Sequence, residues 1–475
     1  MPETILTDPR RQKWLLATVA LGGFIIWLDS CIVNVSLPTI ARFFGVGTSA
    51  ASGVTLAYLL VLTSTLLIFG KLGDTIGLKK VFVGGYFFFT LGSLLCGLSA
   101  TLPFLIASRC VQGLGGAMMF AIGPTLIPRY LPENIRGWAY GMVVTVSALG
   151  LTLGAPLGGF ITGCASWKWI FLVNVPVGAA VMCLTHRVLP GDPERVSRPG
   201  SRIAFDAAGA ALSFLSIVTL VYGLNQGEEL GWCSPVILTC FLASLSLFCL
   251  MIFQERRIRN PLLELGIFRN PDIAFAGWVN LLAFMEMAGA NFLIPFYLVG
   301  VKGLRPGQMG MVLLLYSLAY AVPSLAMGRL SDRIKPRILC CAGMLSVAAA
   351  CAFFAFTLSW RGLIPTLIFM TWLGVSYAAF NSPFNNLIMG LAPVEELGEV
   401  SGVFKTMTNL SFLLGVNIFE TLFSLGIPAG VIREGEPPDE VILGLRRALL
   451  FGVVVSVLAF VLSARIRAVP KSPAR

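Results

Sequence analysis

The sequence predicts an all-α, polytopic membrane protein made of two related halves. Long apolar runs recur along its whole length, and charged residues are too few to cover a surface that faces water. Of the residues, 56% are hydrophobic and 12% are charged, against about 25% charged in a typical soluble domain. A charged stretch between two apolar runs, residues 70–80, returns as residues 328–337. In a membrane protein, such a repeat is typical of a transporter with two halves around a central path.

Each apolar run is long enough to cross a bilayer as a helix, which takes about 20 residues. The runs are continuous rather than alternating, so helices are favoured over membrane-spanning strands. Fourteen spans are predicted, at residues 14–36, 50–70, 80–100, 103–125, 138–161, 167–186, 206–224, 234–254, 273–299, 307–328, 338–358, 362–384, 403–426 and 444–464.

The positions of Lys and Arg predict that both termini are cytoplasmic. These residues gather in alternate loops, as they do on the cytoplasmic side of membrane proteins. The net charge of +11 therefore reflects orientation, and nucleic acid is not an expected partner. Arg10, Arg11 and Lys13 precede a run that is too long for a cleavable signal, so the first span is predicted to remain in the protein.

The reactive side chains do not form a recognisable enzyme site. Most of the eleven cysteines lie within apolar runs, without a CxxC pair, so we expect small buried hydrophobes rather than metal ligands. No nucleophile–base set, metal-ligand spacing or phosphate-binding loop occurs. The sequence therefore predicts neither an enzyme nor a metal-binding or cofactor-binding protein.

The two charged loops lie 258 residues apart in the sequence. A second pair of segments repeats at nearly the same interval. Three residues recur exactly 261 positions later, Pro132, Gly137 and Gly141 as Pro393, Gly398 and Gly402. The first charged loop joins spans 2 and 3, and its copy joins spans 10 and 11, so two spans must lie between the halves. We predict an N-terminal six-helix bundle over 1–190, two peripheral inserted helices over 191–272, and a C-terminal six-helix bundle over 273–475.

Charged side chains within the spans are candidates for proton coupling, because a charge inside the bilayer is costly and usually has a function. Asp29 and Arg109 lie at a similar depth, at about 1.5 Å of rise per residue, and are expected to meet in the outer half of the membrane. A helix movement that separates them would favour proton uptake by Asp29. A fixed structural ion pair is the alternative.

Two further acidic residues lie in spans of the second half. Glu286 is near the middle of its span, among Phe284, Met285 and Met287, and is predicted to alternate between a proton and cargo. The alternative is a neutral glutamic acid that bonds across helices. Glu420 is nearer the outer end of its span, where proton coupling and simple contact with the interface are equally compatible with its position.

Several stretches are similar to the major facilitator superfamily, and within it to the fourteen-helix drug:proton antiporter family. The 70–80 loop resembles the superfamily signature between helices 2 and 3, and residues 109–117 resemble the arginine signature of helix 4. Residues 150–159 are similar to the antiporter signature of helix 5. Residues 28–38 and 167–176 are typical of fourteen-helix members. The resemblance implies the major facilitator fold, with two six-helix repeats plus two inserted helices, and drug:proton antiport.

The repeated charged loops are expected to control opening rather than to touch cargo. Their glycines permit close helix approach. Asp74 can cap a helix end or pair with Arg136, which would lock the outward-facing state. The predicted gating residues are Gly70, Gly73, Asp74, Gly77, Arg136, Asp332 and Arg333.

Helix 5 carries a stripe of small residues. Gly150, Gly154 and Gly158 follow one another at intervals of four, and Pro156 and Gly159 complete the motif. Such a stripe lets another helix pack closely. The resemblance implies that this neighbour is helix 8 of the core fold and that the contact seals the protein against proton leak. Plain helix packing is a compatible alternative.

Four polar residues in or near spans could line a cavity or bond a neighbouring helix: Asn34, Tyr58, Asn381 and Asn385. The acidic candidates favour cationic or neutral lipophilic cargo. The sequence therefore predicts proton-coupled export of a small amphipathic compound across the plasma membrane, driven by the proton gradient without a cofactor. The alternatives are a proton-coupled uptake symporter or facilitator, and a membrane sensor or scaffold.

Overall fold

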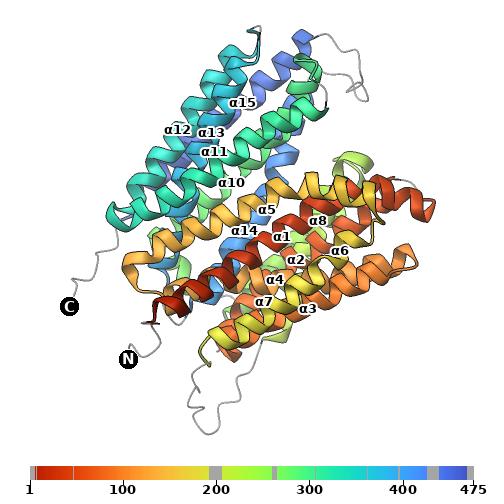
Figure 1. The fold of residues 1–475 in the computed structure, drawn as a ribbon. Helices are drawn as coiled ribbons and strands as arrows, with labels where there is room; N and C mark the ends of the chain where they lie inside the picture. The colour runs from red at the N-terminus through yellow and green to blue at the C-terminus, as the bar shows by residue number, and fades with distance from the viewer. Residues whose placement is uncertain are drawn as a thin grey trace. The chain divides into compact units, whose positions relative to one another are not determined.

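Regular structure in the described part of the chain is entirely helical. The computed structural model describes residues 6, 8–46, 48–191, 206–258, 265–304, 306–360, 362–393, 396–424 and 438–467. Fourteen helices there have fifteen or more residues (Figure 1), in agreement with the fourteen predicted from the apolar runs.

The helices follow one another along the chain with short connections. Up to the inserted pair they are α1 (Pro9–Phe44), α2 (Thr48–Ile76), α3 (Leu78–Leu98), α4 (Leu102–Tyr130), η1 (Glu133–Ile135), α5 (Arg136–Cys164), α6 (Trp169–Leu172), α7 (Asn174–Val188), α8 (Ala207–Leu230) and α9 (Pro235–Glu255). The second half comprises η2 (Leu265–Arg269), α10 (Pro271–Phe296), the π-helical turn η3 (Tyr297–Val301), α11 (Pro306–Arg333), α12 (Pro336–Thr357), α13 (Ile364–Leu391), α14 (Leu397–Ser424) and α15 (Pro438–Arg465).

Thirteen spans in the described residues are long and apolar enough to cross a membrane. The short α6 and α7 together form one of them, Trp169–Val188. The long helix outside this set is α14, which carries Glu399, Lys405 and Glu420. Its greater polarity suggests that α14 contributes more than packing.

Local sequence determines where several helices begin and end. Asp8 caps α1, because its side chain accepts a hydrogen bond from the N–H of Arg10 at 2.9 Å. Asn270 caps α10 in the same way. Gly77 adopts a φ of 115° between α2 and α3, a conformation that L side chains rarely adopt. This glycine therefore permits the sharp turn in the first charged loop.

The described chain forms two compact units. Unit 1 comprises Met1–Ala139, Val146–Ile267 and Ala392–Thr406, and unit 2 comprises Tyr140–Thr145, Phe268–Leu391 and Met407–Arg475. The first turns of α14 thus belong to unit 1, whereas a short segment of α5 belongs to unit 2. The predicted boundaries at 190 and 272 stay a prediction.

Each unit repeats the same packing order. In unit 1, α2 packs on α4, α4 on α3, and α3 on α7. In unit 2, α11 packs on α13, α13 on α12, and α12 on α15, and Figure 1 shows these helices running side by side. The helices correspond one to one in chain order, so the internal repeat seen in the sequence is also a repeat of structure.

The inserted helices α8 and α9 pack on each other, and α8 also packs on α2. Ser216 and Ser244 join the pair, because each hydroxyl donates to the other residue's backbone carbonyl, at 2.9 Å and 2.8 Å. Much of the outer surface of α9 is apolar and exposed, including Leu242, Leu245 and Phe253. Such a surface suits contact with lipid.

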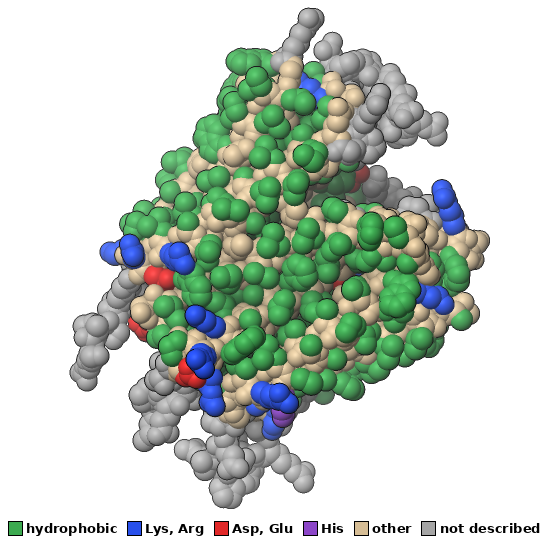
Figure 2. All heavy atoms as spheres, viewed as in Figure 1, with side chains coloured by type: hydrophobic (Ala, Val, Ile, Leu, Met, Phe, Trp, Pro, Cys, Tyr) green, Lys and Arg blue, Asp and Glu red, His purple; other side chains and the backbone are tan. Residues whose placement is uncertain are grey.

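Hydrophobic side chains cover most of the face drawn in Figure 2, and charged side chains are sparse on it. In a water-soluble protein this apolar surface would be a liability. Together with the long helices, it identifies a multi-pass membrane protein.

Candidate functional site

An ion pair between α1 and α4 is completely enclosed in unit 1. Arg109 Nη1 lies 2.6 Å from Asp29 Oδ2, and neither side chain has solvent exposure. The predicted contact between these two residues is therefore confirmed, while their place in the outer half of the membrane stays a prediction. A buried ion pair is stable only when its remaining donors and acceptors are also satisfied.

Two amides and a hydroxyl extend the hydrogen bonding of the pair, whereas Arg109 Nη2 has no hydrogen-bond partner among the described residues. Gln112 Nε2 donates to Asp29 Oδ1 at 2.8 Å and to Ser93 Oγ at 2.9 Å, while its Oε1 accepts from Arg109 Nη1 at 2.6 Å. Asn174, at the start of α7, donates to the same Asp29 oxygen at 3.2 Å. The resulting polar cluster joins four helices, so a proton or charge change at Asp29 would be felt by all of them.

Sequence reasoning did not assign roles to Gln112, Ser93 and Asn174. Gln112 follows Arg109 by three residues, which places both on one face of α4. Asn174 occurs in the run 167–176, which is typical of fourteen-helix members. Helical spacing could therefore have suggested Gln112, but nothing in the sequence brings Asn174 or Ser93 to Asp29.

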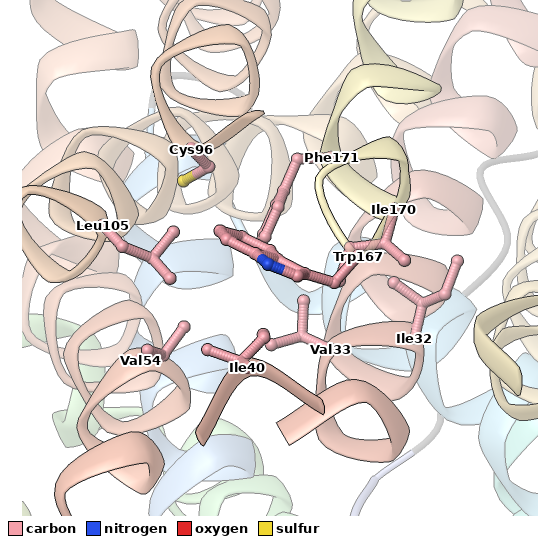
Figure 3. Packing of buried hydrophobic residues seen from close by; sticks show 9 residues of the cluster. All are labelled: Ile32, Val33, Ile40, Val54, Cys96, Leu105, Trp167, Ile170 and Phe171. Atoms are coloured by element: carbon pink, nitrogen blue, oxygen red, sulfur yellow. The ribbon is translucent and has the colours of Figure 1, made fainter. Parts of the chain in front are cut away.

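Aromatic and apolar side chains isolate this polar cluster. The Arg109 guanidinium lies 4.1 Å from the centre of the Tyr58 ring, and its Nε donates to the carbonyl of Val54 at 3.2 Å. Val54 also belongs to a buried apolar cluster in which the indole of Trp167 is surrounded by the other side chains, among them Phe171 (Figure 3). Tyr58 therefore packs against the ion pair, and its predicted place in a cavity lining stays a prediction.

Asp74 caps the start of α14. Its Oδ1 accepts from the N–H of Gly398 at 3.0 Å, and its Oδ2 accepts from the N–H of Glu399 at 2.7 Å. A helix start leaves several N–H groups unpaired and carries a partial positive charge. Of the two roles expected for Asp74, the structure thus shows the helix cap.

The expected partner of Asp74, Arg136, has different contacts. Arg136 donates to the carbonyls of Leu131 at 3.1 Å and Pro128 at 2.8 Å, which secures the turn between α4 and α5. The ion pair at the charged loop is instead Lys71 with Glu399, at 2.6 Å. Residues of α14 take the place expected for Arg136 because α2 lies directly against the first turns of α14.

Glycines allow that close approach. A Cβ added to Gly70 would overlap the carbonyl oxygen of Gly398 and lie 3.1 Å from the Cα of Gly402. Gly73 is closed off by another neighbour, because a Cβ there would overlap the side chain of Ile122 in α4. These positions therefore leave no space for a larger residue without movement of the backbone or a neighbour.

The same contact is repeated in unit 2. A Cβ on Gly141 of α5 would lie 2.6 Å from the carbonyl oxygen of Ser324 and 3.2 Å from the Cα of Gly328, both on α11. Asp332 is half-buried and Arg333 is exposed at the end of α11. Both repeated sequence pairs thus correspond to one structural contact, made once in each unit.

The glycine stripe of α5 faces α1. A Cβ on Gly150 would overlap the carbonyl oxygen of Phe24, one on Gly154 would lie 3.1 Å from that of Leu28, and one on Gly158 would lie 2.9 Å from the carbonyl oxygen of Ile32. Space is open at Gly159, and Pro156 is exposed. Within unit 1 the three glycines thus pack on α1, and the packing on a helix of the other half that the resemblance implies stays a prediction.

Gly141 lies on a different face of α5 from the glycine stripe. Gly141, which does approach α11, lies nine residues before Gly150, and nine residues at 3.6 per turn place the two on opposite faces of α5. Thr145 shares the Gly141 face and donates to the carbonyl of Ala321 on α11 at 2.8 Å. One face of α5 thus meets α11 near its start, and the other face meets α1.

Glu286 is completely buried within unit 2. Cys351 of α12 donates its thiol to Oε1 at 3.2 Å, and Oε2 has no hydrogen-bond partner among the described residues. A Cβ on Gly452 of α15 would lie 3.4 Å from Oε1. The carboxyl group is therefore enclosed by α12 and α15, and its predicted alternation between proton and cargo requires a helix movement.

Glu286 occupies nearly the same place in its repeat as Asp29. The two residues are 257 positions apart, close to the repeat distance of 258, and each lies in the first long helix of its half. Cys351 stands 258 positions after Ser93. Each repeat thus contains a buried acid near a small polar residue of its third helix. Of these two acids, Asp29 is the one that pairs with a buried arginine.

The other polar candidates differ in burial. Asn34 is exposed and accepts a hydrogen bond from Thr55 at 3.0 Å. Asn381 donates to the hydroxyl of Tyr320 and accepts from Asn385 at 2.8 Å. Glu420 is half-buried. Asn34 and Asn381 therefore bond a neighbouring helix of their own bundle, as the alternative interpretation proposed, whereas Asn385 bonds Asn381 of its own helix. Cavity lining stays a prediction for all.

Comparison with known sequences gives a consistent result. The profile of the Major Facilitator Superfamily matches residues 19–416. The riboflavin transporter RibZ of Clostridioides difficile is 30% identical over 415 residues, which cover 87% of this chain and 89% of that protein. The multidrug resistance protein Stp of Mycobacterium tuberculosis is 29% identical, covering 88% and 77%. The methylenomycin A resistance protein of Bacillus subtilis is 30% identical, covering 71% of each chain.

Comparison with solved structures supports the fold. The human organic anion transporter MFSD10 (TETRAN) superposes with a TM-score of 0.67, covering 96% of this chain and 100% of that one. The sequence identity is 14%, so this likeness concerns the fold alone.

Proposed function

Because the chain belongs to the Major Facilitator Superfamily, whose matched relatives are transporters rather than enzymes, we propose that it exports small amphipathic compounds in exchange for protons. Relatives named for multidrug and methylenomycin resistance support export. The observation that carries proton coupling is the enclosed Asp29–Arg109 pair, with both side chains fully buried. Buried charges in spans are uncommon unless they have a function.

Movement of helices would couple this pair to transport. The polar cluster of Asp29 connects α1, α3, α4 and α7. If α1 or α7 shifts relative to α4, Asp29 loses hydrogen bonds that favour its charged form, and proton uptake relieves the isolated charge. Glu286 provides a second buried acid in the corresponding helix of the other half, so each half holds one acid that can respond to such a shift.

Capping of α14 by Asp74 provides the conformational lock. The contact stabilises one arrangement of α2 and α14 through two hydrogen bonds and the Lys71–Glu399 pair. Opening requires that these bonds break together, which suits a two-state switch. Transport would then proceed by rocking of the two halves around a midplane site.

Location and energy source follow from the same proposal. The protein acts in the plasma membrane with both termini in the cytoplasm, uses the proton gradient, and needs no cofactor or nucleic acid. The preference for cationic or neutral cargo rested on the acids of the spans. Asp29 is paired with Arg109, and Glu286 is enclosed. In this arrangement neither acid can select the charge of the cargo by direct contact.

Uptake or facilitated transport of a small metabolite is the second candidate. The similarity to a riboflavin transporter favours it, at 30% identity over most of both chains. The two functions differ in the direction of proton movement: a symporter moves cargo and protons the same way, and a facilitator moves no protons.

Everted membrane vesicles loaded with a pH-sensitive dye provide the test. Cargo added outside to wild-type vesicles with an acidic interior should release protons, and Asp29→Asn and Glu286→Gln should each abolish that release. Glu133→Gln, a substitution at an exposed loop residue, is the matched control and should behave as wild type. A cargo-dependent signal that persists in both acid variants would contradict proton coupling at these residues. Cargo movement without any proton signal in wild type would favour the facilitator.

A further inference from the structure

Lys405 lies on α14, two residues inside the span predicted at 403–426. It lies eight residues after the start of α14 at Leu397, which is about 12 Å along the helix axis. The predicted span begins at residue 403, so Lys405 lies near its end, where a long lysine side chain can also reach the interface; its role must therefore follow from its contacts. The helix that carries it is also the long helix outside the thirteen apolar spans.

Two aromatic side chains accompany Lys405 in unit 1. Its Nζ lies 4.6 Å from the centre of the Phe120 ring in α4. Trp27 of α1 meets the same ring edge to face, at 6.4 Å between centres and 85° between planes. All three side chains are half-buried rather than enclosed. An aromatic face near an ammonium group attracts it electrostatically and also provides a surface on which a planar ligand can stack.

Arg109 cannot supply a charge to cargo in this arrangement. It is fully buried, and Asp29 compensates its charge at 2.6 Å. Lys405 differs because its side chain is partly accessible. Of the two cations, Lys405 is therefore the one that a ligand can approach without dismantling the polar cluster around Asp29.

We propose that Lys405, Phe120 and Trp27 form a subsite for the anionic group and adjoining ring of an aromatic cargo. The ammonium group attracts a carboxylate or sulfonate, and the two rings pack against the planar part of the same molecule. This inference rests on the proposed transport function and specifies its substrate class. It replaces the expectation of a cationic or neutral cargo with that of an aromatic anion.

Two dyes with the same xanthene core test the charge preference directly: fluorescein, which is anionic near neutral pH, and rhodamine 6G, which is cationic. Binding to the purified full-length protein is measured by fluorescence anisotropy, so the result does not depend on proton coupling. Wild type should bind fluorescein more tightly than rhodamine 6G. Lys405→Gln should weaken fluorescein binding by about tenfold or more, as loss of a charge-assisted contact predicts, and leave rhodamine binding equal or tighter.

Two further variants make the result specific. Lys405→Arg keeps the charge and should retain most fluorescein binding. Lys302→Gln removes a half-buried lysine of unit 2 that donates to the carbonyl of Trp360, and should leave both dyes unaffected. If Lys405→Gln cannot be purified, competition in wild type replaces it: an aromatic carboxylate should displace fluorescein at least about tenfold better than its neutral amide.

The proposal is overturned if wild type prefers rhodamine 6G or binds neither dye. It is equally overturned if Lys405→Gln weakens both dyes alike, because that pattern indicates a structural role. Fluorescein binding that depends on Lys405 in a protein whose vesicles show no proton movement would support the subsite while rejecting antiport. The two proposals therefore fail separately.

Discussion

The backbone N–H of Glu399 donates a 2.7 Å hydrogen bond to Oδ2 of Asp74, although 325 residues separate the two in sequence. The neighbouring N–H of Gly398 is bound to the other oxygen of the same carboxylate at 3.0 Å. One side chain thus satisfies two N–H groups that a helix start leaves unpaired, and its negative charge lies at the positive end of the α14 dipole. The contact explains why a carboxylate suits this position of the repeated loop.

Replacement of Asp74 by Asn should slow transport by about tenfold, because an amide offers one acceptor oxygen instead of two and carries no charge. The rate of dye transport in vesicles measures this effect. Asp8→Asn is the matched control, since Asp8 caps α1 at an exposed site where Asn caps about as well as Asp. Equal transport rates in the two variants would contradict a special role for the Asp74 charge.

Single neutralisation of the buried ion pair should be more damaging than removal of both charges. Asp29→Asn or Arg109→Gln leaves one uncompensated buried charge, which typically costs about 3–5 kcal/mol of stability. The double variant leaves none and should be more stable than the sum of the single effects predicts. Thermal unfolding of the purified proteins in detergent provides the comparison, and strictly additive losses would indicate that the two side chains do not interact.

Replacement of Gln112 by Leu should destabilise the protein by about 2 kcal/mol, because buried polar groups then lose their partners. The affected groups are Asp29 Oδ1 and Ser93 Oγ, which accept from Gln112 at 2.8 Å and 2.9 Å. Cys110→Ala, at a half-buried position on the same helix, is the control and should change stability much less. A melting temperature unchanged in Gln112→Leu would show that the polar cluster does not depend on this amide.

The glycine motif of α5 offers a matched pair of substitutions. Gly150→Ala should impair folding or expression, since its Cβ would overlap the carbonyl oxygen of Phe24. Gly159→Ala should be neutral or stabilising by up to about 1 kcal/mol, because space is open there and Ala favours helix over Gly. Expression level and thermal stability measure both. The packing of α5 on α1 would be wrong if the two variants behaved alike.

Much of the architecture was predicted from local information. Continuous apolar runs predicted the helices, and the resemblance to the fourteen-helix drug:proton antiporter family is confirmed by the superfamily match and by relatives named for drug resistance. The contact between Asp29 and Arg109 was also predicted, because depth in a membrane can be counted along a helix at about 1.5 Å per residue.

Other features depended on how helices are rotated about their axes. The stripe of Gly150, Gly154 and Gly158 was evident from spacing, but its packing on α1 is shown by the structure alone. Similarly, the structure pairs the loop of Asp74 with α14 instead of Arg136. A sequence pattern identifies a packing face, whereas the partner of that face depends on the positions of all neighbouring helices.

The sequence by itself thus determined the class of the protein, its helices, its internal repeat and the residues whose charge is costly in a membrane. The physical reason is that hydropathy, chain length and charge are properties of single segments. The tertiary structure alone decided that Gln112 and Asn174 complete the site of Asp29, that Cys351 bonds Glu286, and that Lys405 approaches Phe120. Those contacts join helices far apart in sequence, and no local pattern specifies which side chains such helices bring together.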